Sequence, residues 1–434
     1  MILSQATSYC EECGEGHKAF YEEREGRVVF TVECPRRPRA RTVSSDSDLF
    51  AGIRGRSRSA DDVGVASAAR RLFYLIEITD ACNLSCPLCY AAAGPGRQRY
   101  LGLDEVRALG QKVKADGGKW ITLTGGEPTL HPLMEQIIRL LNREMNLSAL
   151  IVTNGVRIAE DPSFLSRLKR AGLRKVQLQF DTLDDATCVA MRGRSLIREK
   201  LTAIDRIRSA GLRLGLVVTV CDRNIAEVGK ILDYAATLAP ALNTLVFQSA
   251  VPVGRYPGAM GTVDRETIIR SLCKKRTGLD LQPSDFFPPV QYAPWRVMSH
   301  PDCSATAYVC TGEGRTFALG RDVNVDAFYA RLQAGRRWPG PLGAVVIPFV
   351  TLLAHTMPDR RYRVLRRLLG LRSGRGADGL FLVTVGSYMT ADTRDEQRLA
   401  LCTAVHVTAS GFRSLCERCC TRQTTPFQKE MIAS

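Results

Sequence analysis

The stretch "EITDACNLSCPLCYAAAG", from Glu77 to Gly94, places Cys82, Cys86 and Cys89 in a C-x3-C-x2-C spacing. A disulfide would leave one of the three thiols unpaired, and a tetrahedral zinc site would need a fourth ligand nearby. A [4Fe–4S] cluster normally takes four cysteine ligands, so three would leave one of its irons open. Catalytic metal sites keep such an open position for a substrate.

An alternation of strand-like and helical segments begins just before this stretch. The strand-like runs are nearly continuous in apolar residues, as parallel strands buried on both faces are, and helical patterns separate them. The expected strands are residues 72–79, 120–128, 147–155, 175–183, 213–220 and 242–250. Right-handed crossovers would wind them into an α/β fold, a partial (β/α)6 barrel or its full eightfold relative.

Polar residues gather at the carboxyl ends of these strands, where the chemistry of such folds is found. Besides the three cysteines they are Gly125, Gly126, Glu127, Pro128, Thr153, Asn154, Gln179, Asp181, Thr219 and Gln248. Any one of them alone would be typical of a helix cap or a turn. Their recurrence after successive strands favours a functional site, because packing alone does not explain it.

The cysteine triplet together with "TGGEPT" (Thr124–Thr129) resembles the radical S-adenosylmethionine (SAM) superfamily. In that family the open iron of a [4Fe–4S] cluster binds SAM, and an electron from the cluster cleaves SAM to methionine and a 5′-deoxyadenosyl radical. The radical abstracts hydrogen from an unreactive C–H bond. Leu88 is a departure, since the family usually has an aromatic residue before the last cysteine; Tyr90 follows it instead.

The resemblance implies residue roles. Cys82, Cys86 and Cys89 would bind the cluster, and Arg192 in "MRGR" would suit the SAM carboxylate. The implied SAM contacts are Gly125, Gly126, Glu127, Pro128, Thr153, Asn154, Gln179, Asp181, Arg192 and Thr219. A reductant such as flavodoxin or ferredoxin is an implied partner. The residue that donates or accepts hydrogen is not identified by the sequence.

Flanking motifs resemble more narrowly the radical SAM group that contains the archaeal tetraether lipid synthases, members of which are also associated with pterin methylation. These motifs are "VFQSAVPVGR", "DFFPP", "HPDCSATAYVC" and "LCTAVHVTASGFRSLC". The chain departs from that group because it has no cysteine between Cys34 and Cys82. A reaction that needs several clusters is therefore in doubt, and a divergent member with another substrate is expected.

The chain is expected to have four parts: a cysteine-rich unit at 1–35, a flexible Arg/Ser-rich linker at 36–70, the barrel at 71–257 and an α+β extension at 258–434. The first part joins "CEEC" to a strand-like run, as small zinc or iron ribbons do. Second metal sites are predicted at Cys10, Cys13 and Cys34, with His17 or Glu12 as a further ligand, and at Cys303, Cys402 and Cys416, where an auxiliary Fe–S cluster is expected. Free structural thiols are the alternative for both groups.

Charge and hydropathy bear on partners. Lys plus Arg number 60 against 44 Asp plus Glu, a net charge of +16, which favours an anionic partner. The apolar run 341–354 is shorter than the roughly 20 residues that span a bilayer. Residues 359–375 could form a basic amphipathic helix that contacts an anionic membrane or merely covers the barrel. No signal peptide is recognised, so a cytoplasmic location is expected, at most peripheral to the membrane's inner face.

Three hypotheses follow for the function. The first is an enzyme acting on a C–H bond of a lipid or another small anionic metabolite, by coupling, methylation or epimerisation. The second is a maturase of a peptide or protein that uses an auxiliary cluster. The third is a metal-binding scaffold, against which the GGEP turn argues. Nucleic acid is disfavoured as a partner, because the basic residues are scattered and no base-reading motif appears.

Overall fold

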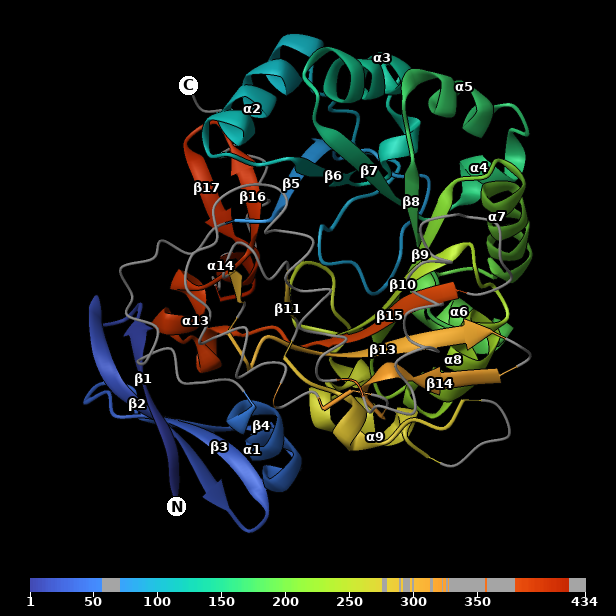
Figure 1. Ribbon diagram of the computed structural model, residues 1–434. Helices are drawn as coiled ribbons and strands as arrows, with labels where there is room; N and C mark the ends of the chain where they lie inside the picture. The colour runs from blue at the N-terminus through green and yellow to red at the C-terminus, as the bar shows by residue number, and fades with distance from the viewer. Residues whose placement is uncertain are drawn as a thin grey trace.

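The computed structural model describes residues 1–56, 71–274, 279–288, 290–291, 297–298, 300–312, 315–321, 323–324, 327, 356 and 379–420 (Figure 1). Within them the largest element is an 11-stranded sheet in the order β14-β13-β15-β10-β9-β8-β7-β6-β5-β16-β17. A four-stranded antiparallel sheet lies at the N-terminus. A short antiparallel pair joins β11 (Val290–Gln291) and β12 (Val297–Met298).

The expected partial barrel is confirmed. Its parallel strands are β5 (Phe73–Thr79), β6 (Trp120–Gly125), β7 (Ser148–Thr153), β8 (Lys175–Gln179), β9 (Arg213–Val220) and β10 (Leu242–Ser249). Helices α2 (Leu103–Ala115), α3 (Met134–Arg139), α4 (Val156–Glu160), α5 (Phe164–Ala171), α6 (Asp185–Arg192), α7 (Ile197–Ser209) and α8 (Val228–Ala236) connect them. Neighbouring strands in the chain are neighbours in the sheet, as successive right-handed crossovers produce. Figure 1 shows most of these helices outside the curved sheet.

The two faces of the barrel strands differ in composition. In β8, Val176 and Leu178 are fully buried and belong to the main core cluster, whereas Lys175, Gln177 and Gln179 alternate with them and line the interior. This period-2 pattern is that of a strand with one packed face. The expectation that the strands are packed on both faces is therefore wrong for the inner face, which surrounds a cavity lined by both aliphatic and polar side chains.

The C-terminal extension continues the same sheet at both edges. On one side β15 (Gly379–Gly386) pairs parallel with β10, and β13 (Ser304–Gly312) and β14 (Arg315–Ala318) follow antiparallel. On the other side β16 (Ala404–Thr408) pairs parallel with β5, and β17 (Gly411–Ser414) turns back on it. Helices α9 (Arg265–Leu272), α13 (Glu396–Ala400) and α14 (Leu415–Cys420) complete the described extension. The predicted boundary at residue 257 therefore does not separate two sheets.

The N-terminal sheet is larger than expected. It contains β1 (Ile2–Cys10), β2 (Glu15–Arg24), β3 (Arg27–Val32) and β4 (Arg39–Ser44), and helix α1 (Ser47–Gly55) follows. The linker predicted for 36–70 is wrong over its first half, because Asp46 caps α1 by accepting from the Leu49 backbone N–H at 2.9 Å. Leu49, Phe50 and Ile53 of α1 are buried, so the polar composition hid an amphipathic helix. Residues 57–70 lie outside the described residues.

Buried polar contacts join this sheet to the extension. Tyr21 is 1% exposed, and its hydroxyl donates to Asp395 Oδ2 at 2.9 Å. Arg54 of α1 forms an ion pair with the buried Asp302 at 2.7 Å. These contacts link segments more than 240 residues apart in the sequence. They hold the N-terminal sheet and α1 against the C-terminal extension.

The Tyr21–Asp395 contact predicts a stability effect. Tyr21→Phe removes the donor and leaves a buried carboxylate oxygen less satisfied, so the free energy of unfolding should fall by about 1–3 kcal/mol. Tyr9→Phe in the same sheet is the matched control, because Tyr9 is 36% exposed, and it should change stability by less than about 0.5 kcal/mol. Urea denaturation followed by circular dichroism measures both. Equal effects of the two variants would show that the hydrogen bond between Tyr21 and Asp395 does not stabilise the fold.

Candidate functional site

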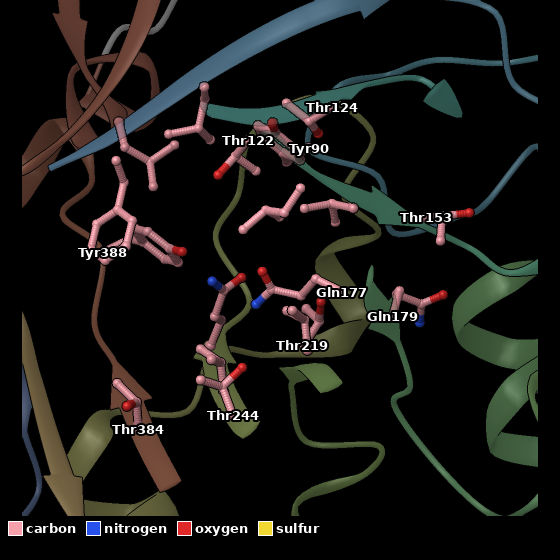
Figure 2. A pocket seen from close by; sticks show the side chains of 18 of the residues that line it. Tyr90, Thr122, Thr124, Thr153, Gln177, Gln179, Thr219, Thr244, Thr384 and Tyr388 are labelled. Atoms are coloured by element: carbon pink, nitrogen blue, oxygen red, sulfur yellow. The ribbon is translucent and has the colours of Figure 1, made fainter. Parts of the chain in front are cut away.

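A cavity of about 970 Å³ occupies the interior of the barrel. Its lining runs from the cysteine loop at the carboxyl ends of the strands to Phe73, Lys175 and Asn243 at the amino ends. Figure 2 shows side chains from several strands around this one space, among them Thr122, Gln177 and Thr244. The extension contributes Thr384, Tyr388 and other residues to the wall, so the cavity needs the extension to be complete.

Most of the residues predicted from the sequence meet at this cavity. Those that line it are Cys82, Cys86, Cys89, Gly125, Gly126, Glu127, Thr153, Asn154, Gln179, Arg192, Thr219 and Gln248. Pro128 and Asp181 do not line it. Pro128 begins a helical turn behind the glycines, and Asp181 lies behind Arg192.

The two glycines of the GGEP turn allow a close approach to the cysteine loop. Gly126 N donates to Thr79 O at 2.8 Å, and Glu127 N donates to Ala81 O at 2.7 Å. A Cβ on Gly126 would lie 2.1 Å from Ala81 O, and Gly125 has φ +134° with the same distance to Thr79 O. Only glycine fits both positions, because neither backbone oxygen can move away without opening the turn.

Glu127 connects this turn to the end of β7. Its carboxylate is 1% exposed; Oε1 accepts from the Thr153 hydroxyl at 2.6 Å, and Oε2 accepts from the Asn154 N–H at 2.7 Å. Thr129 also donates to Oε1 through its N–H and hydroxyl. Oε2 keeps acceptor capacity toward the cavity, since a carboxylate oxygen takes about two hydrogen bonds. An amine of a bound ligand would satisfy it.

Arg255 clamps the cysteine loop, and the sequence analysis missed it as a site residue. Its Nε donates to Cys86 O at 2.9 Å, its Nη2 donates to Ala93 O at 2.5 Å, and its backbone pairs with Cys89 at 2.9 Å in both directions. Gly254 before it has φ +68°, and a Cβ there would lie 2.4 Å from Cys89 O. The signal was present in "VPVGR", but sequence alone does not show that this segment reaches the loop.

Arg192 lies in the cavity wall and is held from behind. Its Nε donates to Asp181 Oδ2 at 2.7 Å, its Nη1 to Leu88 O at 2.8 Å and its Nη2 to Thr219 Oγ1 at 3.3 Å. Asp181 Oδ1 accepts from the Thr219 N–H at 2.8 Å, so both of its oxygens are occupied. Asp181 is therefore placed to position Arg192, and its own contact with SAM stays a prediction.

Lys200 is a second residue that the sequence analysis missed. It is 3% exposed, and its Nζ donates to Asn154 O at 2.8 Å, to Gln179 O at 2.7 Å and to Gln179 Oε1 at 2.5 Å. Burial lowers the pKa of Lys200 to about 8. Lys200 thus joins the ends of β7 and β8. Because the Gln179 amide oxygen faces Lys200, the amide nitrogen Nε2 has no hydrogen-bond partner among the described residues.

The electrostatics of the cysteine loop suit an iron cluster. Burial raises the pKa of Cys82 to about 12 and also raises the pKa of Cys86, which the nearby Arg192 partly offsets. Without added positive charge these thiols stay protonated, and metal binding supplies that charge.

The N-terminal cysteines do form a compact group. Ligand atoms of Cys10, Cys13 and Cys34 lie within 4.8 Å of one another. Cys13 Sγ is 2.9 Å from His17 Nε2 and 3.8 Å from Cys34 Sγ. The backbone N–H of Cys13 lowers the pKa of Cys10 to about 7. Three thiols and an imidazole at this spacing are a donor set for one tetrahedral ion.

The C-terminal cysteines are near neighbours behind the cavity wall. Burial raises the pKa of Cys416, and the nearby thiols of Cys303, Cys419 and Cys402 raise it further. Cys419 lines the cavity, whereas Cys420 is buried on the same short helix, α14. Cys303, Cys402 and Cys416 are therefore close enough to interact electrostatically, and a metal site shared by them stays a prediction.

Arg418, which no sequence pattern predicted as a site residue, links α14 to the barrel. Arg418 forms an ion pair with the buried Glu77 of β5, and its guanidinium lies 4.7 Å from the ring centre of Tyr90. The Tyr90 hydroxyl is 3.5 Å from Glu77 Oε1. Tyr90 lines the cavity beside Cys89, so this pair holds the aromatic wall that follows the third cysteine.

Two predictions concern residues outside the described part of the chain. The apolar run 341–354 and the basic segment 359–375 both lie outside the described residues. Thr356, between the two segments, is described and forms an isolated bridge with Val323. Among the described residues, no helix combines the length and apolar character needed to cross a membrane.

The sequence model of the radical SAM superfamily matches residues 76–235. A 7,8-dihydro-6-hydroxymethylpterin dimethyltransferase of Methanocaldococcus jannaschii is 24% identical over 74% of this chain and 71% of its own length. A GTP 3′,8-cyclase of Pectobacterium atrosepticum is 33% identical over 36% of this chain, and the match spans about half (49%) of the cyclase. The solved structure of Streptococcus suis SuiB has a TM-score of 0.41 and 12% identity, over 61% of this chain and 67% of SuiB.

None of these relatives is a tetraether lipid synthase, so the narrower group predicted from the flanking motifs is not confirmed. The matched region contains the cysteine loop, the GGEP turn and the strand ends that carry Asn154, Gln179 and Thr219. The sequence matches and the barrel geometry lead to one conclusion: residues 76–235 are those of a radical SAM enzyme.

Proposed function

We propose that Cys82, Cys86 and Cys89 hold the enzyme's [4Fe–4S] cluster at the mouth of the barrel cavity and that the chain acts on a C–H bond of a small molecule inside it. The observation that carries this proposal is that all three thiols line one cavity with the GGEP turn. When bound, the cluster and SAM supply a 5′-deoxyadenosyl radical, and radical SAM enzymes need a reductant for this.

The residues around the cysteine loop would bind and orient SAM. Glu127 Oε2 and the backbone of the GGEP turn offer acceptors for its amine. Arg192 offers guanidinium N–H groups that Asp181 aims into the cavity, which suits its carboxylate. Gln179 Nε2, Thr153 and Thr219 line the adjoining wall and would contact its remaining polar groups.

A small-molecule substrate is favoured over a peptide. The cavity lies inside the barrel strands, and the extension adds β13, β15 and α14 to its wall. The two sequence relatives described above are named for a pterin and for GTP, both small molecules. The reaction type, whether coupling, methylation or epimerisation, is left open. A peptide or protein maturase is the second candidate, and it rests on the additional cysteines.

Those cysteines are proposed to bind metal in two further sites. Cys303, Cys402 and Cys416 would hold an auxiliary Fe–S cluster, with Cys419 as the neighbouring fourth thiol. Cys10, Cys13 and Cys34 would hold a zinc or iron ion with His17. Glu12 is the poorer candidate, because its carboxylate pairs with Arg37 at 3.0 Å.

The first test removes the cluster ligands. The triple variant Cys82→Ala, Cys86→Ala, Cys89→Ala should release no 5′-deoxyadenosine from SAM under reductant, although it should retain metal at the other sites. Cys273→Ala is the control, since Cys273 does not line the cavity. Chromatography of the product and metal analysis measure both outcomes. Release of 5′-deoxyadenosine by the triple variant would end the proposal.

The second test concerns the clamp on the cysteine loop. Arg255→Met removes charged donors from Cys86 O and Ala93 O, each worth about 1.5–3 kcal/mol. The loop should lose its shape, and the rate of 5′-deoxyadenosine release and the iron content should fall at least about tenfold. Arg208→Met on the outer face of α7 should leave both unchanged. An Arg255→Met enzyme with full iron content and rate would show that the loop does not depend on this clamp.

The third test concerns the N-terminal metal. His17→Ala should lose about one metal ion per chain on dialysis against a chelator, because three thiolates alone leave a tetrahedral ion incomplete. Glu12→Gln should retain the ion, and both variants should still release 5′-deoxyadenosine. Retention of the ion by His17→Ala would assign the fourth position to another group or to water.

A further inference from the structure

Of the described residues that line the far end of the cavity, one is a lysine. Lys175 is the first residue of β8, and its side chain lies on the same strand face as Gln177 and Gln179, toward the cavity. Its Nζ is 3.0 Å from Asn243 Oδ1 and 3.4 Å from Thr244 Oγ1, both neutral groups on β10. The intervening strand β9 has Gly215 at this level, where a Cβ would lie 3.4 Å from Lys175 Cε.

Lys175 differs from the other charged residues of the cavity wall. Those are Glu127 and Arg192, which lie at the opposite end and are bound by several partners. In the described part of the chain, Lys175 forms no ion pair with a carboxylate. Burial and, to a smaller extent, the neighbouring Arg213 lower the pKa of Lys175 to about 8. A half-buried cation whose described partners are neutral dipoles is costly to the fold.

The wall between Lys175 and the cysteine loop is mostly apolar. It is built largely from aliphatic side chains of the strands, with threonine and amide groups between them (Figure 2). The aliphatic residues are Leu75, Leu150, Val152, Val217, Val246, Leu380 and Leu382. Among the described lining residues, a ligand that spans this distance therefore meets a mostly apolar wall along its length and the positive charge of Lys175 at its end.

We propose that the substrate is an anionic amphiphile, with a carboxylate or phosphate-monoester head bound by Lys175 and an apolar body that extends toward the cysteine loop. This inference rests on the proposed function, because it takes the cavity to be the substrate site. One lysine matches one or two negative charges. A nucleoside triphosphate would bring about four into an apolar channel, which Lys175 alone does not balance.

The holoenzyme, reconstituted without oxygen, can be titrated by calorimetry with decyl phosphate and decanoate below their critical micelle concentrations and with decanol below its solubility limit. Wild type should bind at least one of the two anions about tenfold or more tightly than decanol, and the stronger anion identifies the head group. Lys175→Met should lose that preference and bind all three alike. Arg213→Gln is the matched control, since Arg213 is the exposed register partner of Lys175, and it should keep the preference.

Two further readouts separate recognition from a structural role. The preference of the wild type should decline as pH rises through about 8, where unbound Lys175 loses its proton. Lys175→Met should be at least as stable as wild type, because it removes a desolvated cation. A structural lysine would give the opposite result. Equal binding of decanol and both anions by wild type, or an unchanged preference in Lys175→Met, would overturn the inference.

Release of 5′-deoxyadenosine without substrate separates this inference from the proposed function. It should be the same in wild type and in the control Arg213→Gln, because Arg213 is exposed and does not line the cavity. If wild type releases none, the proposed function fails. If release is normal and the head-group preference is absent, only the inference fails.

Discussion

The packing of the GGEP turn against the cysteine loop is the constraint on which the site depends. Two backbone hydrogen bonds, from Gly126 N and Glu127 N, cross between the end of β6 and the start of the loop. They form only because residues 125 and 126 lack a Cβ. Glu127 then extends the link to β7 through Asn154. The three strand ends become one rigid surface, so ligands bound to any of them are held in a fixed relation to the thiols.

A second layer of charged side chains supports that surface from behind. Arg192 is oriented by Asp181, Arg255 binds loop carbonyls, and Arg418 pairs with Glu77 beneath Tyr90. Each cation is held in place by protein acceptors, so the positive charge near the thiols is a fixed part of the fold. Such preorganisation matters where buried thiols must become thiolates, because nearby fixed charge lowers the free energy of the ionised form.

Local patterns in the sequence were sufficient for the strands, their order and the residues at their carboxyl ends, because parallel strands and their loops are short-range features. They did not reveal Lys200, Arg255 or Arg418, whose partners lie between 21 and 341 residues away. They also missed β4 and α1, where arginine and serine on the exposed faces hid Val43 and Ile53. The cavity inside the barrel was missed for a similar reason. A threonine or glutamine within an apolar run does not indicate by itself that its side chain faces a cavity, because the cavity forms only when the sheet curves.

The two ends of the cavity are electrostatically unlike, and this difference defines a direction. At the cysteine end Glu127 and Arg192 are compensated, so that end accepts a zwitterionic ligand with little net change in charge. At the other end Lys175 is compensated by dipoles alone. A molecule with one negative end has its lowest energy with that end at Lys175. Its uncharged portion then lies nearest the thiols, which is where an unactivated C–H bond must be for a radical formed there to reach it.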